Sequence, residues 1–302
     1  MSFLSFSIIG YLLLSVEAVL SKALLTGRLK SWQVYVFYVG IFSAFSFLLF
    51  PFGLAWSGWE SFSASFLSGV IFLGSIGFLF CALYKSSASR VYVLFGSVST
   101  VTTLLLSDII VGQPATVNEF VGILILLLGG FFISFKFYKG RLFSSWKKIL
   151  IAGVLNGVSL VVLKVSYEQQ NFISGYIYSR LGIVFGTLVL FGWPTFRQAI
   201  NKGLSKGRKK KAGDLFGVIG TKALAGLGTI IVQYAIFLGN VAIVNALVSV
   251  QYLFTFILSI TLSIFFKKIF REEIFASNLF FKLIGVVLVV IGVFLVNVKF
   301  DF

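Results

Sequence analysis

Three ionisable residues interrupt long apolar runs, and they are the side chains of this chain best suited to chemistry: Glu17, Arg180 and Lys222. A charge far from water is costly and normally faces a cavity or a partner. Glu17 and Lys222 each lie about eight residues, or about 12 Å, from the same end of their runs. They are therefore predicted to pair. Their role stays open between a structural ion pair, a site for substrate or protons, and side chains that extend to the surface.

Arg180 lies about eight residues, or about 12 Å, from the opposite end of its run. Its planar fork suits a carboxylate or a phosphate, so we predict that it holds the acidic group of a substrate. The alternative is an arginine that donates to backbone carbonyls. Four lysines lie nearer the run ends and are expected to extend to the interface: Lys22, Lys85, Lys164 and Lys282.

Polar residues and glycines recur at helical spacing on three of the apolar runs. The stripes are Lys222, Gly226, Thr229 and Gln233 on one run, Asn245, Ser249 and Tyr252 on the next, and Tyr92, Gly96 and Ser99 on an earlier one. Such a stripe either lines a water-filled path or joins helices. We expect the path. The substrate-binding candidates therefore also include Gln233, Asn245, Ser249, Tyr252, Tyr92 and Ser99.

The composition of the chain argues against catalysis. It has no histidine and one cysteine, Cys81, which excludes a His-based metal site or proton relay and an intrachain disulfide. We find no Ser/His/Asp set, no metal-ligand cluster and no phosphate loop. The expectation is a protein that is not an enzyme, needs no cofactor or metal, and drives any active transport with a gradient.

The elements that carry these residues are membrane helices. Of 302 residues, 59% are hydrophobic and 11% are charged, and the mean hydropathy is +1.05, beyond what a soluble core requires. Apolar runs of about 20 residues, the length that spans a bilayer, recur along the chain. We count ten, at about 3–25, 32–54, 62–84, 90–111, 117–135, 149–167, 172–193, 214–238, 241–266 and 276–298. The expected fold is an all-α polytopic integral membrane protein.

The net charge of +16 is concentrated in alternate connections between the runs. Nineteen Lys and Arg residues fall there, against Lys299 alone on the other side. By the positive-inside rule these connections are cytoplasmic, which places both termini outside the cell membrane. We attribute the basic stretch Gly207–Lys211 to topology and to anionic lipid headgroups of the bilayer, with no nucleic-acid role.

The two halves of the chain are related. IGVVLVVIGVFLV at Ile284–Val296 matches VGILILLLGGFFI at Val121–Ile133, with glycines seven residues apart in both. Lys22 and Gly40 match Lys164 and Gly182 at a shift of 142, and CALY at Cys81–Tyr84 matches YAIF at a shift of 153. We predict two five-helix repeats, 1–139 and 140–302. Because five is odd, they have inverted topology, as in many secondary transporters.

This pattern resembles the ten-helix EamA-type members of the drug/metabolite transporter superfamily along the whole chain. The resemblance rests on Lys22 and Lys164, on Arg180-Leu-Gly, on the A-[LI]-[YF] helix ends, and on the Gly112-Gln113 turn before Gly122. That turn also resembles the small multidrug resistance branch. Its membrane glutamate falls here at Leu14, while this chain has Glu17. EamA-type chains usually carry prolines where Ser99 and Tyr252 stand. The resemblance implies transport, and termini in the cytoplasm.

The function expected is a secondary transporter or exchanger of small polar metabolites, anionic or zwitterionic, by alternating access through a central cavity. Two alternatives stay open. One is a flippase of a lipid with an anionic headgroup, with a cavity that opens sideways. The other is a proton-coupled exporter of cationic or amphipathic compounds. The sequence leaves open whether the protein is a monomer or a homodimer.

Overall fold

The computed structural model describes residues 2–25, 32–83, 88–134, 145–205, 212–265 and 276–297, and in these ranges the chain forms helices and no strands. In chain order the elements are α1 (Phe3–Leu25), α2 (Trp32–Ala44), the 3-10 helix η1 (Phe45–Phe52), α3 (Trp59–Leu83), α4 (Ala88–Leu106), the π-helix η2 (Ser107–Val111), α5 (Val117–Ser134), α6 (Trp146–Gln169), α7 (Phe172–Gly192), α8 (Pro194–Ser205), α9 (Ala212–Leu238), α10 (Val241–Ala246), α11 (Val248–Phe265) and α12 (Ala276–Asn297).

The described part of the chain contains nine helices long and apolar enough to cross a membrane. Their positions agree with the expected runs, since an unbroken apolar stretch satisfies all its backbone hydrogen bonds only as a helix in lipid. The remaining run forms α5, whose apolar segment Val117–Ile133 is shorter. Ten spans therefore remain part of the proposal made below.

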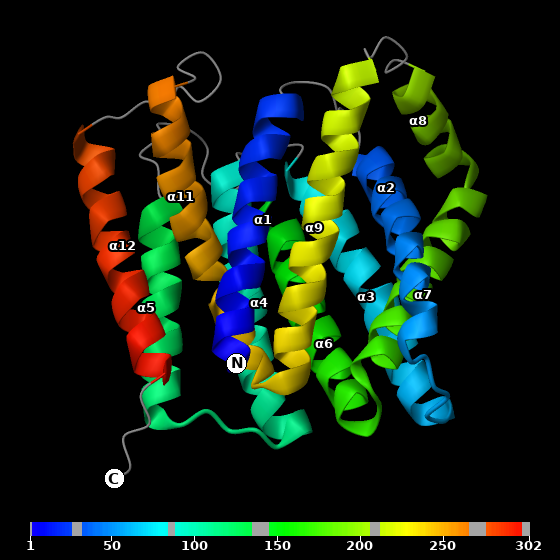
Figure 1. Cartoon of the computed structure of the whole chain (residues 1–302), viewed down its shortest axis with the longest axis horizontal. Coiled ribbons are helices and arrows are strands. Elements are labelled where there is room, and N and C mark those ends of the chain that lie inside the picture. Colours follow the sequence, from blue (N-terminus) through cyan, green and yellow to red (C-terminus); the bar gives the residue numbers. More distant parts are fainter. Residues whose placement is uncertain are drawn as a thin grey trace.

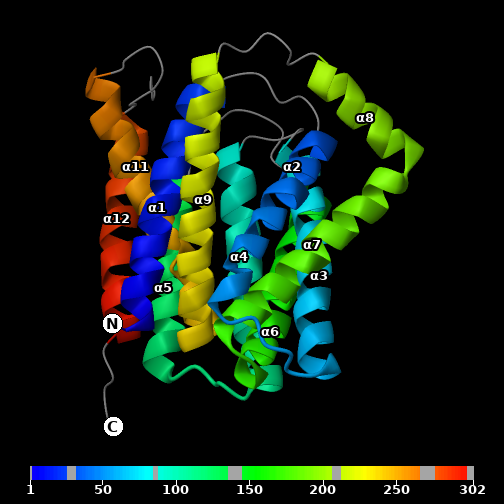
Figure 2. The same cartoon turned by 45° about the vertical axis from the view of Figure 1, so that its right-hand side comes forward.

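The helices stand side by side as two groups, with α1, α9, α11, α5 and α12 on one side and α2, α3, α6, α7 and α8 on the other (Figures 1 and 2). Helices α4 and α10 contact each other and join the groups. We call the end of the bundle that carries Glu60, Asp108, Glu119 and Glu168 the acidic end. The other end, where α1 and α3 finish, is called the basic end. Helix α1 begins and α12 finishes at the acidic end (Figure 1).

Helices α5 and α12 pack together through the glycines that recur every seven residues. A methyl group on Gly122 would lie 3.2 Å from the Gly292 carbonyl oxygen, and one on Gly129 would lie 3.0 Å from that of Gly285. In the other direction, Gly285 faces the Gly129 carbonyl at 2.7 Å and Gly292 that of Gly122 at 3.1 Å. The spacing thus serves two close helix crossings, since small residues let backbones approach within a membrane.

Helix α3 packs against both α6 and α7. Toward α6 it presents serines, and Ser68 donates to the Ser159 carbonyl at 2.8 Å while Ser75 donates to that of Ala152 at 2.7 Å. Toward α7 it presents glycine: a methyl group on Gly69 would overlap the Ser179 carbonyl oxygen, and one on Gly182 would overlap that of Phe66. This leaves α3 and α7 in backbone contact.

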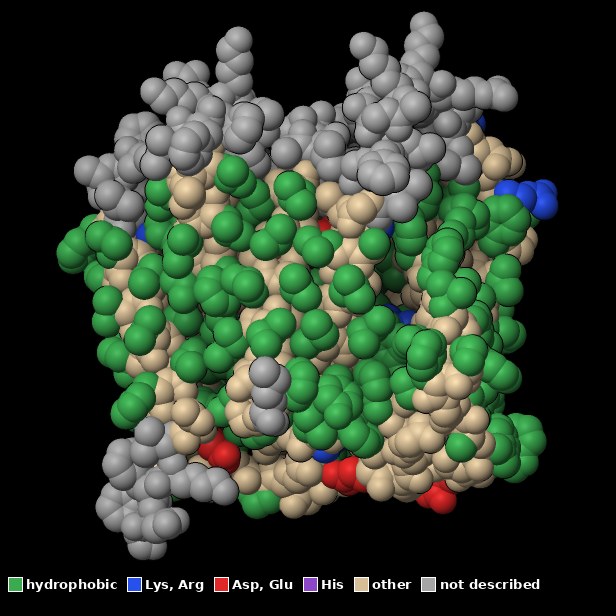
Figure 3. Space-filling view, viewed as in Figure 1, with side chains coloured by type: hydrophobic (Ala, Val, Ile, Leu, Met, Phe, Trp, Pro, Cys, Tyr) green, Lys and Arg blue, Asp and Glu red, His purple; other side chains and the backbone are tan. Residues whose placement is uncertain are grey.

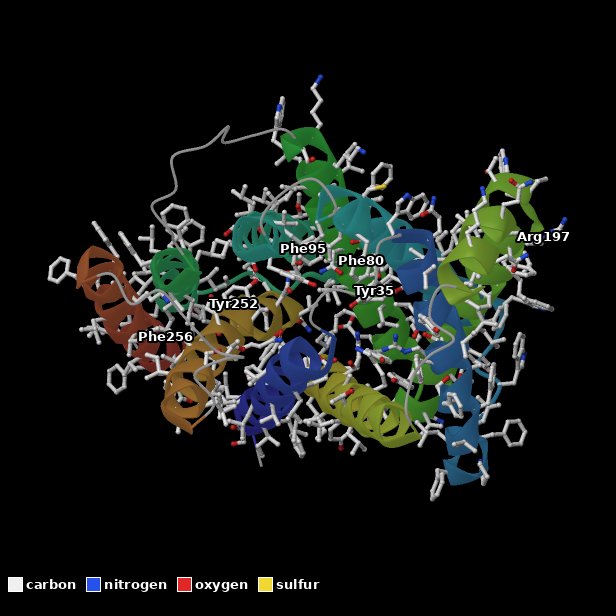
Figure 4. The ribbon with its side chains drawn as sticks, turned by 90° about the horizontal axis from the view of Figure 1, so that it is seen from above. Tyr35, Phe80, Phe95, Arg197, Tyr252 and Phe256 are labelled. Carbon is white, nitrogen blue, oxygen red and sulfur yellow. The ribbon has the colours of Figure 1, made fainter. Side chains whose placement is uncertain are left out.

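The connection between the expected runs at 172–193 and 214–238 contains a helix, α8. Phe196 and Ile200, one turn apart, are buried against the start of α2, and the Phe196 ring meets Trp32 at 5.9 Å. Arg197 points outward at the edge of the bundle (Figure 4). An apolar face with basic residues opposite is typical of a helix that lies in the membrane interface.

Candidate functional site

The predicted pair of Glu17 and Lys222 is present. Lys222 Nζ donates to Glu17 Oε1 at 2.8 Å, across the interface of α1 and α9. The side chains are 15% and 26% exposed, respectively. The pair is therefore neither dry nor fully in water, which leaves room for a substrate or a water molecule to reach it.

A group of tyrosines connects this pair with the middle of the bundle. Tyr35 of α2 is within electrostatic range of both Glu17 and Lys222, and Tyr92 of α4 is within range of Tyr35 and Glu17. Tyr92 remains 40% exposed although it lies between helices, and its carbonyl accepts a 3.0 Å bond from the Tyr252 hydroxyl. We call Tyr35, Tyr92 and Tyr252 the tyrosine group.

Apolar rings complete this central region. Tyr35 stacks on Phe80 with ring centroids 4.2 Å apart. Seen from the basic end, Tyr35, Phe80 and Phe95 lie together in the middle of the bundle, and Tyr252 projects from α11 on the facing side (Figure 4). The geometry combines a charged pair with flat apolar surfaces and hydroxyl groups.

A hollow opens on the side of the bundle, between the surface of α9 and that of α2 and α7, and basic side chains are visible in it (Figure 3). Arg180 and Lys222 are the basic residues of these three helices. On α9, Gly226 is exposed, and no described atom of a neighbouring helix would lie within 4 Å of a methyl group there. The stripe face of α9 is thus open at this level.

Arg180 is buried within α7, with 8% of its surface exposed. Its guanidinium lies over the ring of Tyr176, one turn earlier, at 4.6 Å. Its Nε has no hydrogen-bond partner among the described residues. A cation–π contact holds the group in place, but it leaves the donors of the fork to other acceptors, and a buried donor without an acceptor is costly.

Further buried polar atoms near Arg180 also have no hydrogen-bond partner in the described part of the chain. The Tyr167 hydroxyl is one, and it lies within electrostatic range of Arg180. Gln170 Oε1 is another, and its side-chain nitrogen would lie 3.2 Å from a methyl group on Gly175, beside Tyr176. On the stripe of α9, Gln233 Oε1 is likewise buried without a partner among the described residues. We call Arg180, Tyr167 and Gln170 the arginine cluster.

Two predicted stripe residues belong to a buried hydrogen-bond network. Asn245 of α10 donates to Ser99 at 3.0 Å and to Thr103 at 2.9 Å, and Asn156 of α6 donates to the same Ser99 hydroxyl at 2.8 Å. Ser99 is 1% exposed. These side chains join α4, α6 and α10. Their predicted contact with substrate remains a prediction.

The other stripe residues are distributed between packing and the open face. Ser249 is buried where α11 meets Gly130 of α5. Thr229 donates to its own helix at the Ala225 carbonyl, 2.7 Å away. The stripe that was expected on one continuous helix is divided, because the helix is interrupted at Leu247 between α10 and α11. The structure therefore groups Glu17, Lys222, Tyr92 and Tyr252, and it joins Asn245 to Ser99 in a separate hydrogen-bond network.

Two lysines expected to extend to the interface are buried instead. Lys164 is 4% exposed and donates to the Phe237 carbonyl in the last turn of α9 at 3.2 Å, where a helix end attracts cations. Lys282 is 8% exposed, with Nζ 4.6 Å from the ring of Phe256. A partner was available in each case, so the expectation was wrong. The side chains of Lys22 and Lys85 lie outside the described residues.

The sequence did not identify Tyr35, Tyr167 or Gln170 as part of a site. Tyr167 and Gln170 belong to a polar segment, Ser166–Asn171, at the end of an apolar run. The expected run ended at 167, so Tyr167 fell in its last turn and Gln170 fell beyond it. In the structure Gln170 Nε2 donates to the Ser61 carbonyl at 3.3 Å and to the Ser65 hydroxyl at 2.7 Å, so the segment also joins α6 to α3.

The chain is thus a polytopic helical membrane protein with polar groups enclosed between its helices. No model of a protein family matches the sequence, and neither does any curated protein. A solved structure described as "Crystal structure of protein" has a similar fold, with a TM-score of 0.68 over 97% of this chain and 98% of that chain. The two are 13% identical, so the likeness concerns the fold alone.

Proposed function

We propose that this protein is a ten-helix secondary transporter of EamA type. In this proposal it moves small anionic or zwitterionic metabolites by alternating access through a cavity between its two groups of helices. The single observation that carries the proposal is the buried guanidinium of Arg180, whose Nε has no acceptor in the part of the chain that the structure describes. A carboxylate or phosphate of a substrate would satisfy that fork with two bonds.

Helix contacts support the two inverted repeats that the proposal requires. In the repeat relation Gly122 is equivalent to Gly285, and Gly129 is equivalent to Gly292. The contact of Gly122 with Gly292 is therefore equivalent to the contact of Gly129 with Gly285. Similarly, Gly10 of α1 faces the Gly228 carbonyl of α9 at 3.1 Å. The equivalent residues, Ala152 and Ser75, meet at the α3–α6 crossing. Equal registers at related crossings are expected from inverted repeats.

Transport by purified protein in proteoliposomes tests the proposal. Counterflow is measured with a panel of amino acids, sugar phosphates, nucleosides and quaternary amines. We expect counterflow of a compound that carries a carboxylate or a phosphate, and competition by other acids. Exchange of quaternary amines alone would favour the proton-coupled exporter of cationic compounds instead.

A second candidate function is favoured by the hollow on the side of the bundle (Figure 3). A hollow between α9 and α2 that faces the lipid would admit a lipid whose anionic headgroup reaches Arg180 while its chains stay in the bilayer. Scrambling of a fluorescent anionic lipid in the same proteoliposomes separates the functions. Lipid movement without counterflow of any water-soluble acid would assign the flippase.

The proposed orientation has both termini outside the cell. It follows from nineteen basic residues in alternate connections against one on the other side. A reporter that is active only in the cytoplasm, fused after Phe302, is expected to stay inactive, while the same reporter inserted after Gly207 is expected to be active. The opposite result would support the cytoplasmic termini that the EamA resemblance implies.

A further inference from the structure

Two helix contacts that the repeats relate to each other are unequal in the structure. This comparison rests on the repeats of the proposed function. Helices α3 and α7 are in backbone contact through Gly69 and Gly182. In the repeat relation α9 is the equivalent of α3, and α2 is the equivalent of α7. Yet among the described residues α2 and α9 make no comparable contact, and the hollow of Figure 3 lies between them.

The residues at the crossing explain the difference. Gly182 has an equivalent glycine, Gly40, at a shift of 142. Gly69 does not: at the shift of 153 that relates α3 to α9, its equivalent is Lys222. In the α3–α7 contact even a methyl group at position 69 would overlap the Ser179 carbonyl. A lysine at the equivalent place prevents α9 from approaching α2 in the same way.

We propose that Lys222 is a wedge that keeps the hollow between α2 and α9 open while α3 and α7 are closed at the other end. It thereby sets which end of the cavity is open at rest. Glu17 compensates the charge of the wedge, because its carboxylate accepts a hydrogen bond from Lys222 Nζ at 2.8 Å across the α1–α9 interface. Closing α2 onto α9 requires the lysine to move from the crossing, and the charge must stay compensated as it moves.

The related interface supports this assignment. Glu17 is equivalent to Ser159 at a shift of 142, and Ser159 is joined to Ser68, the neighbour of Gly69, by hydroxyl hydrogen bonds. The α3–α6 interface therefore has small neutral groups where the α1–α9 interface has a charged pair. Small groups accompany the closed contact and the charged pair accompanies the open one.

The test measures exposure of the closed contact. Ser179, 4% exposed beneath Gly69, is replaced by cysteine in a Cys81→Ser protein in lipid nanodiscs. Its reaction with a polar maleimide is followed without substrate, so that the result does not depend on which compound is transported. Lys222→Gly is expected to raise the reaction rate about tenfold. The conformation in which α3 and α7 are separated, populated at about a few per cent in the parent, then becomes a major one.

Glu17→Gln is the matched control, since it removes the ion pair and keeps the lysine. We expect its rate to stay within about twofold of the parent, because a steric wedge persists without its partner. If Lys222→Gly does not fold, Glu17→Ser combined with Lys222→Gly reproduces the Ser159 and Gly69 arrangement and takes its place. The proposal is overturned if the maleimide reaction rate of a Lys222→Gly protein equals that of the parent. It is also overturned if Glu17→Gln raises the rate as much as Lys222→Gly does.

Discussion

Replacing Arg180 by glutamine is expected to reduce transport of the acidic substrate by about 10 to 100-fold, because a hydrogen bond to a charged group contributes about 1.5 to 3 kcal/mol. Arg180→Lys keeps the charge and loses the fork, so its loss is expected to be smaller, at about tenfold. Initial rates of uptake into proteoliposomes, together with binding measured by calorimetry, give both effects.

The control for Arg180 is Arg197→Gln on α8, an exposed arginine at the outer edge of the bundle (Figure 4). It should transport as well as the parent protein. Thermal unfolding in detergent distinguishes lost binding from lost structure. If Arg180→Gln carries acids at the parental rate, the guanidinium serves α7 through its stacking on Tyr176 and holds no substrate.

The second large effect concerns stability and the pair of Glu17 and Lys222. Breaking a fully buried pair costs about 3 to 5 kcal/mol, and the partial exposure of these side chains reduces the expected loss to about 1 to 3 kcal/mol. Glu17→Gln and Lys222→Gln should each lower the unfolding temperature. The charge exchange Glu17→Lys with Lys222→Glu should recover part of the loss.

A double-mutant cycle with both glutamine variants measures the coupling. Glu60→Gln, in the exposed first turn of α3, is a matched acidic control and is expected to leave the unfolding temperature unchanged within the error. Two harmless single variants with additive effects would mean that the 2.8 Å contact contributes no coupling energy.

The sequence was sufficient for features that depend on distance along a single helix. Apolar length located the helices, and equal depth from the helix ends correctly paired Glu17 with Lys222. The glycines that are seven residues apart in both halves lie at the two close crossings of α5 and α12. Each of these inferences uses only the regular geometry of a single α-helix, with a rise of 1.5 Å per residue and about 3.6 residues per turn.

Features that depend on neighbouring helices could not be predicted in this way. Lys164 is buried because the Phe237 carbonyl of another helix accepts a hydrogen bond from its Nζ. Tyr167 and Gln170 become part of a candidate site only beside Arg180. Helix α8 was not predicted, because its apolar face consists of few residues, Phe196 and Ile200, among basic ones. Hydropathy averaged over a span-length window hides such a short face.

The way the helices pair bears on how the protein is made. The most extensive contacts join α1 to α9, α3 to α6 and α5 to α12, so each of them unites the segment before residue 139 with the segment after it. Ribosomes deliver the first five helices to the bilayer before these partners exist. The early half must therefore wait in lipid with its glycine and serine faces uncovered. Two separately expressed halves would each lack their main interfaces and assemble only when they are produced in the same membrane.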